Sequence, residues 1–254
     1  MRSCTEQTVG KFVEIKQDKC LGAGVAVTVG SMIHSERSEL ANQRVLPVAR
    51  EGYPLILGSA LVTAVFAVLG LHVLTLFCLA VTLFICFFFR DPERAIPDEE
   101  GAVVSPADGK IVDVGVLQES DFSAEKMLKI SIFMSVFNVH VNRIPDHGKV
   151  TEVNYYPGKF FSANLDKASR DNERNAVTLE ISGGRRLIVV QVAGLIARRI
   201  ICKIREGDRL SRGARFGMIC FGSRLDVYLP PDAAPAVSVG DKVLAGTSVL
   251  AHLS

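Results

Sequence analysis

The residues with the clearest potential for chemistry are Gly222 and Ser223, which lie between two strand-like apolar stretches near the end of the sequence. A Gly-Ser step is most often a simple turn. It also suits backbone self-cleavage, because the serine hydroxyl can attack the preceding carbonyl, which glycine leaves unhindered. The resulting ester can undergo β-elimination to dehydroalanine, which hydrolyses to a pyruvoyl group. Ser223 is therefore the candidate nucleophile, and the Gly222–Ser223 bond is the candidate cleavage site.

Such a nucleophile needs a base, and His140 is the candidate. We predict a strand over Val136 to Val141, in which His140 shares one face with Asn138 and Asn142. Asp108 lies in the turn-forming run Ser105-Pro-Ala-Asp-Gly109 at a strand tip. A histidine oriented by an aspartate is a common base for a serine nucleophile. A structural histidine and an ordinary turn are the alternative interpretations.

The adjacent Phe160 and Phe161 lie in a loop that contains Gly158. They are either ordinary core residues or an apolar lip through which a lipid tail enters. With Asn142, they are the candidate substrate-binding residues.

Short strands separated by Gly, Pro and Asp turns dominate the chain from Pro97 onward, which indicates a β-dominated (α+β) catalytic domain. The predicted strands are Val103–Val104, Lys110–Val114, Leu128–Phe133, Val136–Val141, Val150–Tyr156, Val177–Ile181, Leu187–Val192, Ile200–Ile204, Phe216–Phe221 and Leu225–Leu229. Helical signals are sparse: Ala193 to Arg199, and a turn over Ser123 to Met127.

The stretch from Tyr53 to Phe89 contains no Asp, Glu, Lys or Arg. As one helix its roughly 37 residues would span about 55 Å, against about 30 Å for the apolar core of a bilayer. Division near Gly70-Leu71-His72 gives two segments of about 17 to 18 residues, each just long enough to cross. We therefore predict a transmembrane or membrane-embedded helical hairpin, with a pair of buried helices in a soluble protein as the alternative.

Arginines before and after the apolar stretch favour a hairpin with both ends in the cytoplasm, which places the catalytic domain on the cytoplasmic side of the inner membrane. The predicted division is a polar extension of unknown role at 1–43, the hairpin and its flanks at 44–96, and the catalytic domain at 97–254. The extension is either flexible or precedes a later translation start such as Met32.

The bulk composition excludes several classes of partner. A net charge of +2 gives no electrostatic argument for nucleic acid. The six cysteines form no C-x-x-C pair and no compact Cys/His cluster, which argues against a zinc site and a disulfide framework. We expect no metal and no diffusible cofactor.

Taken together, these segments resemble the phosphatidylserine decarboxylase proenzymes, in their short form with a membrane hairpin. The resemblance extends from about Val48 to the C-terminus. It rests on the segments Val48-Ala-Arg-Glu-Gly-Tyr-Pro-Leu-Ile56, Phe89-Arg-Asp-Pro-Glu-Arg94, Ser105-Pro-Ala-Asp-Gly109, Phe137-Asn-Val-His-Val-Asn-Arg143, Asp171-Asn-Glu-Arg174, Ala197-Arg-Arg199, Arg215-Phe-Gly217 and Phe221-Gly-Ser-Arg224.

The resemblance implies self-cleavage between Gly222 and Ser223 into a β chain that ends at 222 and an α chain of residues 223–254, held together as a heterodimer. Ser223 would become a covalent pyruvoyl group that forms a Schiff base with phosphatidylserine and accepts electrons as CO₂ leaves. The product would be phosphatidylethanolamine. Asp108 would be the self-processing acid and His140 its partner.

One departure concerns the histidines. The longer relatives carry two histidines three residues apart in this segment, whereas here His140 matches the first and Arg143 stands in place of the second. Either His140 serves both self-cleavage and decarboxylation, or one of these roles has moved to another group. Our candidate for the proton donor after decarboxylation is His140.

Two other readings are open. Val103–Val112 and Val237–Gly246 resemble the halves of a lipoyl- or biotinyl-type hammerhead, which would suit a membrane-anchored adaptor without activity. The sequence lacks a Met-Lys-Met-type attachment lysine between them. Alternatively, pyruvoyl chemistry could act on a soluble amino acid, although the apolar hairpin favours a lipid, and an archaeal-type serine lipid would share the same head-group chemistry.

Overall fold

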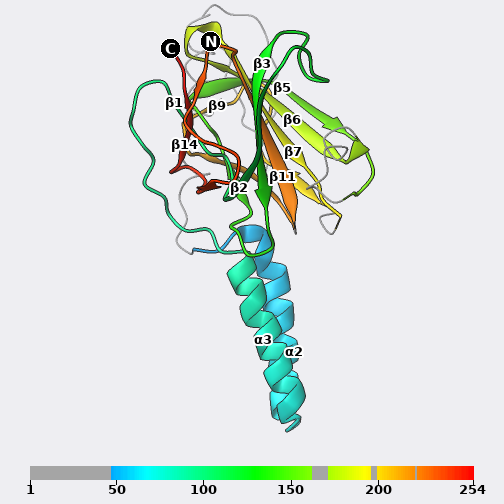
Figure 1. Ribbon diagram of the computed structural model, residues 1–254. Helices are drawn as coiled ribbons and strands as arrows, with labels where there is room; N and C mark the ends of the chain where they lie inside the picture. Colours follow the sequence, from blue (N-terminus) through cyan, green and yellow to red (C-terminus); the bar gives the residue numbers. More distant parts are fainter. Residues whose placement is uncertain (1–46, 162–170, 196–198, 221) are drawn as a thin grey trace, which may run out of the picture.

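A helical hairpin projects from one end of a β-sheet domain (Figure 1). The computed structural model describes residues 47–161, 171–195, 199–220 and 222–254, and the predicted extension at 1–43 lies outside them. The described part of the catalytic region is built mainly from strands, as the β-dominated prediction requires.

The helices and strands follow one another along the chain, with short 3-10 turns at Arg50–Gly52 and Ser182–Gly184. The helices are α2 (Tyr53–Val68) and α3 (His72–Phe88), and the strands are β1 (Ala102–Val104), β2 (Gly109–Leu117), β3 (Met127–Met134), β4 (Val141–Arg143), β5 (Gly148–Tyr156), β6 (Arg174–Ile181), β7 (Arg186–Val192), β8 (Ile200–Cys202), β9 (Arg209–Leu210), β10 (Arg215–Ile219), β11 (Ser223–Leu229), β12 (Ala234–Pro235), β13 (Lys242–Val243) and β14 (Val249–His252).

The largest sheet has the order β13-β2-β3-β11-β7-β6-β5-β9 among the described strands. Alternate residues of its strands, among them Ile132, Val189 and Leu225, point into one buried apolar core. Strand β11 begins at Ser223 and lies between β3 and β7. Ser223 pairs with Met134 of β3, and from Arg224 onward β11 is paired on both sides, so the sheet fixes the strand that the candidate nucleophile begins.

Two smaller sheets, β1-β14-β12 and β4-β10-β8, complete the domain within the described residues. Ala102 pairs with His252 in β1 and β14, and Gly109 pairs with Val243 in β2 and β13. The two hammerhead-like segments thus lie side by side. Their resemblance to a hammerhead therefore describes part of this domain.

The hairpin divides where the sequence predicted. Helix α2 ends at Val68, Gly70 takes a left-handed φ of +71°, and α3 begins at His72. The hydroxyls of Thr63 and Thr82 lie 3.2 Å apart and link the two helices. Arg50–Val68 is long and apolar enough to cross a membrane, whereas His72–Phe88 is shorter, so the helices are present and their placement in a bilayer stays a prediction.

The base of the hairpin is closed by the chain that enters and leaves it. Val48 and Arg90 form an antiparallel bridge, and the Ala49 amide donates to the Phe89 carbonyl at 2.7 Å. Ala49 and Phe88 pack with Val139, Val141 and Met218 in a separate buried cluster. The hairpin is thereby anchored on the segment that carries His140.

The predicted strand over Val136–Val141 is wrong in its boundaries. The Ser135 amide and hydroxyl both donate to Asn138 Oδ1, and the Asn138 amide donates back to the Ser135 carbonyl. This side-chain turn competes with strand formation, so β4 begins only at Val141. Similarly, Ala193–Leu195 are not helical, and the rest of that predicted helix lies mostly outside the described residues.

Candidate active site

Ser223 is fully buried at the start of β11, directly after a glycine with a left-handed φ. Its hydroxyl contacts the sulfur of Met134, with Oγ 3.5 Å from Sδ. Gly222 has a φ of +60°, and a Cβ added there would meet no atom of the described, non-adjacent residues within 4 Å. Glycine is therefore favoured at 222 by backbone conformation and not by crowding.

His140 is fully buried immediately before β4. Its carbonyl accepts a hydrogen bond from the Ile219 amide at 3.4 Å, and its ring lies 4.2 Å from the Phe88 ring at the end of α3. Within the described residues, neither ring nitrogen makes a well-formed hydrogen bond. His140 thus sits where the hairpin meets the strands that lead to Gly222.

Burial lowers the pKa of His140 to about 4; the nearby Asn138 backbone opposes this shift, and the positive charge of Arg90 adds to it. At neutral pH the imidazole is uncharged, which is the form that can accept a proton.

Asp108 is buried, but its carboxylate hydrogen-bonds to groups other than His140. Oδ2 accepts from Arg94 Nη2 at 2.8 Å, and Oδ1 accepts from the Ala245 amide at 2.7 Å. The predicted Asp108–His140 hydrogen bond is not formed in this structure. Burial lowers the pKa of Arg90, and the charge of Asp108 opposes this shift, so Arg90 interacts electrostatically with both residues.

Asn142 is buried and lies next to the same sulfur as Ser223. Its Nδ2 is 3.8 Å from Met134 Sδ, and its Oδ1 accepts from Gln191 Nε2 at 2.9 Å. The structure therefore brings Asn142 and Ser223 together around Met134.

The two candidate phenylalanines differ in environment. Phe160 packs against Ala193 and Ile219, close to the end of β10. Phe161 is 40% exposed, and Asn172 holds its backbone through hydrogen bonds to both the amide and the carbonyl. The Phe160 ring is thus packed inside the domain, and of these two residues only Phe161 presents an apolar surface to a ligand.

Arg143, which stands where the longer relatives have a second histidine, belongs to a buried ionic cluster. Its Nη2 lies 3.3 Å from Asp91 Oδ1, and its Nη1 donates to the Gly213 carbonyl. Arg215 binds Asp91 and Glu93. Burial and the neighbouring Arg215 lower the pKa of Arg143 to about 10, so it remains a cation at neutral pH. Its contacts are structural.

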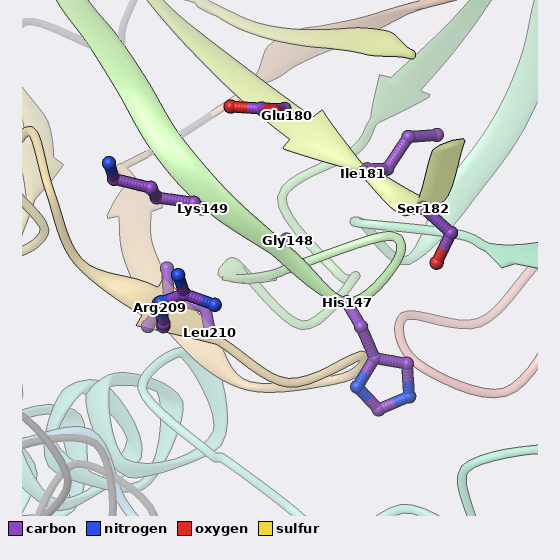
Figure 2. Close-up of a pocket in the computed structure, with 8 residues that line it drawn as sticks. All are labelled: His147, Gly148, Lys149, Glu180, Ile181, Ser182, Arg209 and Leu210. Atoms are coloured by element: carbon purple, nitrogen blue, oxygen red, sulfur yellow. The ribbon is translucent and has the colours of Figure 1, made fainter. Parts of the chain in front are cut away.

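A surface pocket of about 400 Å³ opens elsewhere on the domain, beside β5, β6 and β9 (Figure 2). His147, Lys149, Glu180 and Arg209 line it, and none of the candidate site residues does. Its walls mix both charge signs, and it lies apart from the chemistry at Ser223.

Gln191, Met134 and Arg94 contact the candidate residues but were not themselves predicted as site residues from the sequence. A signal existed for Gln191, which is the one polar residue between Leu187 and Val192 in an otherwise apolar strand. No comparable pattern marked Met134, an apolar residue at the end of an apolar strand, and Arg94 appeared as part of the segment Phe89–Arg94, without a predicted partner.

Comparisons with known proteins identify the family of this chain. The family model for phosphatidylserine decarboxylase matches residues 81–251, which is more than half of the chain. The chain belongs to the phosphatidylserine decarboxylase family.

Members of this family from three bacteria are similar over most of their length. Those of Geotalea uraniireducens and Syntrophotalea carbinolica are both named phosphatidylserine decarboxylase proenzyme, and each is 52% identical over 207 residues, covering 82% of this chain and 97% of the relative. That of Geobacter metallireducens, with the same name, is 52% identical over 212 residues. The relatives thus support an enzyme made as a proenzyme, and give no support to an inactive adaptor.

Proposed function

We propose that this protein cleaves its own Gly222–Ser223 bond and then decarboxylates phosphatidylserine to phosphatidylethanolamine. The observation that carries the proposal is a left-handed Gly222 directly before the buried hydroxyl of Ser223, in a chain whose relatives are named proenzymes of that activity. Glycine in this conformation exposes its carbonyl to a neighbouring nucleophile.

Self-cleavage begins when Ser223 Oγ attacks the Gly222 carbonyl carbon. A base takes the hydroxyl proton, the new C–O bond forms, and the C–N bond breaks as the nitrogen gains a proton. Loss of the Ser223 α-proton then expels the Gly222 carboxylate, and water replaces the nitrogen to leave a pyruvoyl group and ammonia. His140 is the proposed base because it is buried, uncharged at neutral pH, and bonded through its backbone to the strand that leads to Gly222.

In this proposal Asp108 acts indirectly, through the residues that it binds or influences by its charge. Its bond to the Ala245 amide joins the large chain to the small chain, and its bond to Arg94 holds the carboxylate within the large chain. Its charge also acts on Arg90, which in turn acts on His140. Asp108 therefore supports self-processing by holding the two chains in place and balancing the local charge.

The surroundings of Ser223 fit a covalent pyruvoyl group. The position is buried, and Asn142 offers an amide NH₂ group beside it. The ring nitrogens of His140 make no hydrogen bond within the described residues. Bound there, the group would accept the electrons released as CO₂ leaves the substrate. His140 is the proposed proton donor to the product, since Arg143 is committed to Asp91. Asn142, Phe160 and Phe161 are the proposed substrate contacts.

The hairpin favours a lipid substrate over a soluble amino acid. Its helices expose large apolar side chains, with Leu57 70% and Leu76 67% exposed. A bilayer would cover these faces and hold the base of the hairpin, with His140, at the lipid surface. Both ends of the hairpin meet the catalytic domain, so they lie on the same side of the membrane, and the arginines before and after the hairpin support the cytoplasmic side of the inner membrane.

The test is lipid conversion in detergent-lipid micelles, measured by mass spectrometry of the lipids. We expect the wild-type protein to convert phosphatidylserine to phosphatidylethanolamine, and Ser223→Ala to be inactive although folded. Free serine in parallel samples should remain unchanged. Conversion of free serine without conversion of the lipid would contradict the assignment, as would equal activity of Ser223→Ala.

A further inference from the structure

Three buried side-chain amides form a hydrogen-bonded chain that ends beside Ser223. Asn175 Nδ2 donates to Gln191 Oε1 at 3.1 Å, and Gln191 Nε2 donates to Asn142 Oδ1 at 2.9 Å. The residues lie on β6, β7 and β4, and each is buried. Such networks hold their members in one arrangement when every polar group has a partner.

A backbone carbonyl fixes which ends of these hydrogen-bonded amides donate and which accept. Gln191 Nε2 also reaches the carbonyl oxygen of Ile201 at 3.5 Å, and because a carbonyl only accepts, that end of Gln191 must be the NH₂ group. Asn142 must then turn Oδ1 toward Gln191 and Nδ2 away from it. Gly217 makes room, since a Cβ there would lie 2.2 Å from the Ile201 oxygen and 3.0 Å from Gln191 Nε2.

The NH₂ group of Asn142 is thereby directed to the reaction centre, where its acceptor among the described residues is a weak one. Asn142 Nδ2 and Ser223 Oγ lie 3.8 and 3.5 Å from the same sulfur, Met134 Sδ. A thioether accepts hydrogen bonds poorly. In a buried site, a preoriented N–H group interacts far more strongly with an oxygen that becomes negative.

We propose that the Asn142 amide stabilises the negative oxygen formed when Ser223 attacks the Gly222 carbonyl, and that Gln191 is the positioning residue that keeps this amide turned toward Ser223. The charge exists only between formation of the C–O bond and rupture of the C–N bond. The inference rests on the self-cleavage proposed above, and it gives Asn142 a role before any substrate binds.

Substitutions at Gln191 can separate its effect on the orientation of the Asn142 amide from its effect on packing. Gln191→Glu presents an acceptor, so Asn142 should reverse its amide and face Ser223 with oxygen. Gln191→Met has a similar volume and no hydrogen bond, so Asn142 can still rotate its NH₂ group toward Ser223. We expect Asn142→Asp and Gln191→Glu to slow self-cleavage by about 100-fold, as when an oxyanion donor is lost. Gln191→Met should be slowed less.

The readout is the intact mass of freshly synthesised protein over time, with and without hydroxylamine, which cuts an accumulated ester. A defect in the attack step predicts full-length chain in both samples. Ser131→Ala is the matched control, because Ser131 is buried on β3 near Met134 and its hydroxyl has no hydrogen-bond partner in the described part of the chain. It should cleave at the wild-type rate, and circular dichroism should show that all variants fold.

Three results would overturn the proposal while the wild-type chain cleaves normally: wild-type rates in both Asn142→Asp and Gln191→Glu, a Gln191→Met variant as slow as Gln191→Glu, or full-length variant chain that hydroxylamine cuts. A wild-type chain that never cleaves would instead overturn the proposed function, and this inference with it.

Discussion

At the scale of single residues, the conformation of Gly222 carries much of the self-cleavage proposal. An L-residue in the left-handed region costs about 1–2 kcal/mol, which lowers the population of that conformation by about 5- to 30-fold. We predict that Gly222→Ala slows self-cleavage by a comparable factor, measured as the half-time of full-length chain. The added methyl group itself meets open space.

Gly115→Ala provides the control, because a Cβ there also meets nothing within 4 Å and its φ lies outside the left-handed region. It should cleave at the normal rate. Equal rates for both variants and the wild-type protein would show that the backbone conformation at 222 does not matter.

The lowered pKa of His140 makes a prediction about stability. The pKa is about 4 in the folded protein and about 6.5 unfolded, so between these values the unfolded chain binds a proton that the folded chain does not. Stability must therefore fall as the pH drops through this window, by on the order of 3 kcal/mol in total.

The measurement compares thermal unfolding with and without His140→Phe, both in a Ser223→Ala background that keeps the chain intact. Circular dichroism is the suitable signal, since the chain has no tryptophan. The His140→Phe protein should lose less stability between pH 6.5 and 4. Parallel pH profiles would mean that His140 is not buried in its neutral form.

At the scale of elements, the hairpin is the part that we expect to meet the membrane. An arginine near the centre of a membrane helix costs about 2.5–3.5 kcal/mol. Leu61→Arg and Leu79→Arg, each at an exposed position near the middle of a different helix, should therefore weaken binding to lipid vesicles in a flotation assay. Val239→Arg, at an exposed apolar position of the β domain, should bind like the wild type. Unchanged flotation of both hairpin variants would contradict a membrane-embedded hairpin.

The sequence predicts these elements better than their contacts. The uncharged run and Gly70 located both helices, and apolar runs between turn residues located most strands. The segment before Val141 was misjudged because the side chain of Asn138 forms a turn with Ser135 that apolar periodicity does not reveal.

The partners of the candidate site residues could not be predicted in the same way. Asp108 binds Arg94 and Ala245, and Asn142 binds Gln191, from distant parts of the chain. Such pairings depend on sheet order and register, which local sequence does not determine.

At the scale of the whole molecule, cleavage would not release the small chain. Residues 223–254 include β11, which lies between β3 and β7, and β14, which pairs with β1. Leu225, Val227 and Leu229 are fully buried, and each contributes about 1.5–3 kcal/mol to the association. We predict that the two chains elute together on size exclusion in mild detergent and separate only in denaturant. Loss of the small chain under native conditions would contradict this.

The most direct test of the account is the intact mass of the purified protein beside Ser223→Ala. We predict two chains in the wild-type sample, a larger one ending at Gly222 and a smaller one of residues 223–254. The smaller chain should be lighter than a serine-terminated chain by one ammonia, as a pyruvoyl end requires, and Ser223→Ala should remain whole. A single uncut chain in a folded wild-type sample, or a small chain that begins with an unmodified serine, would contradict the account.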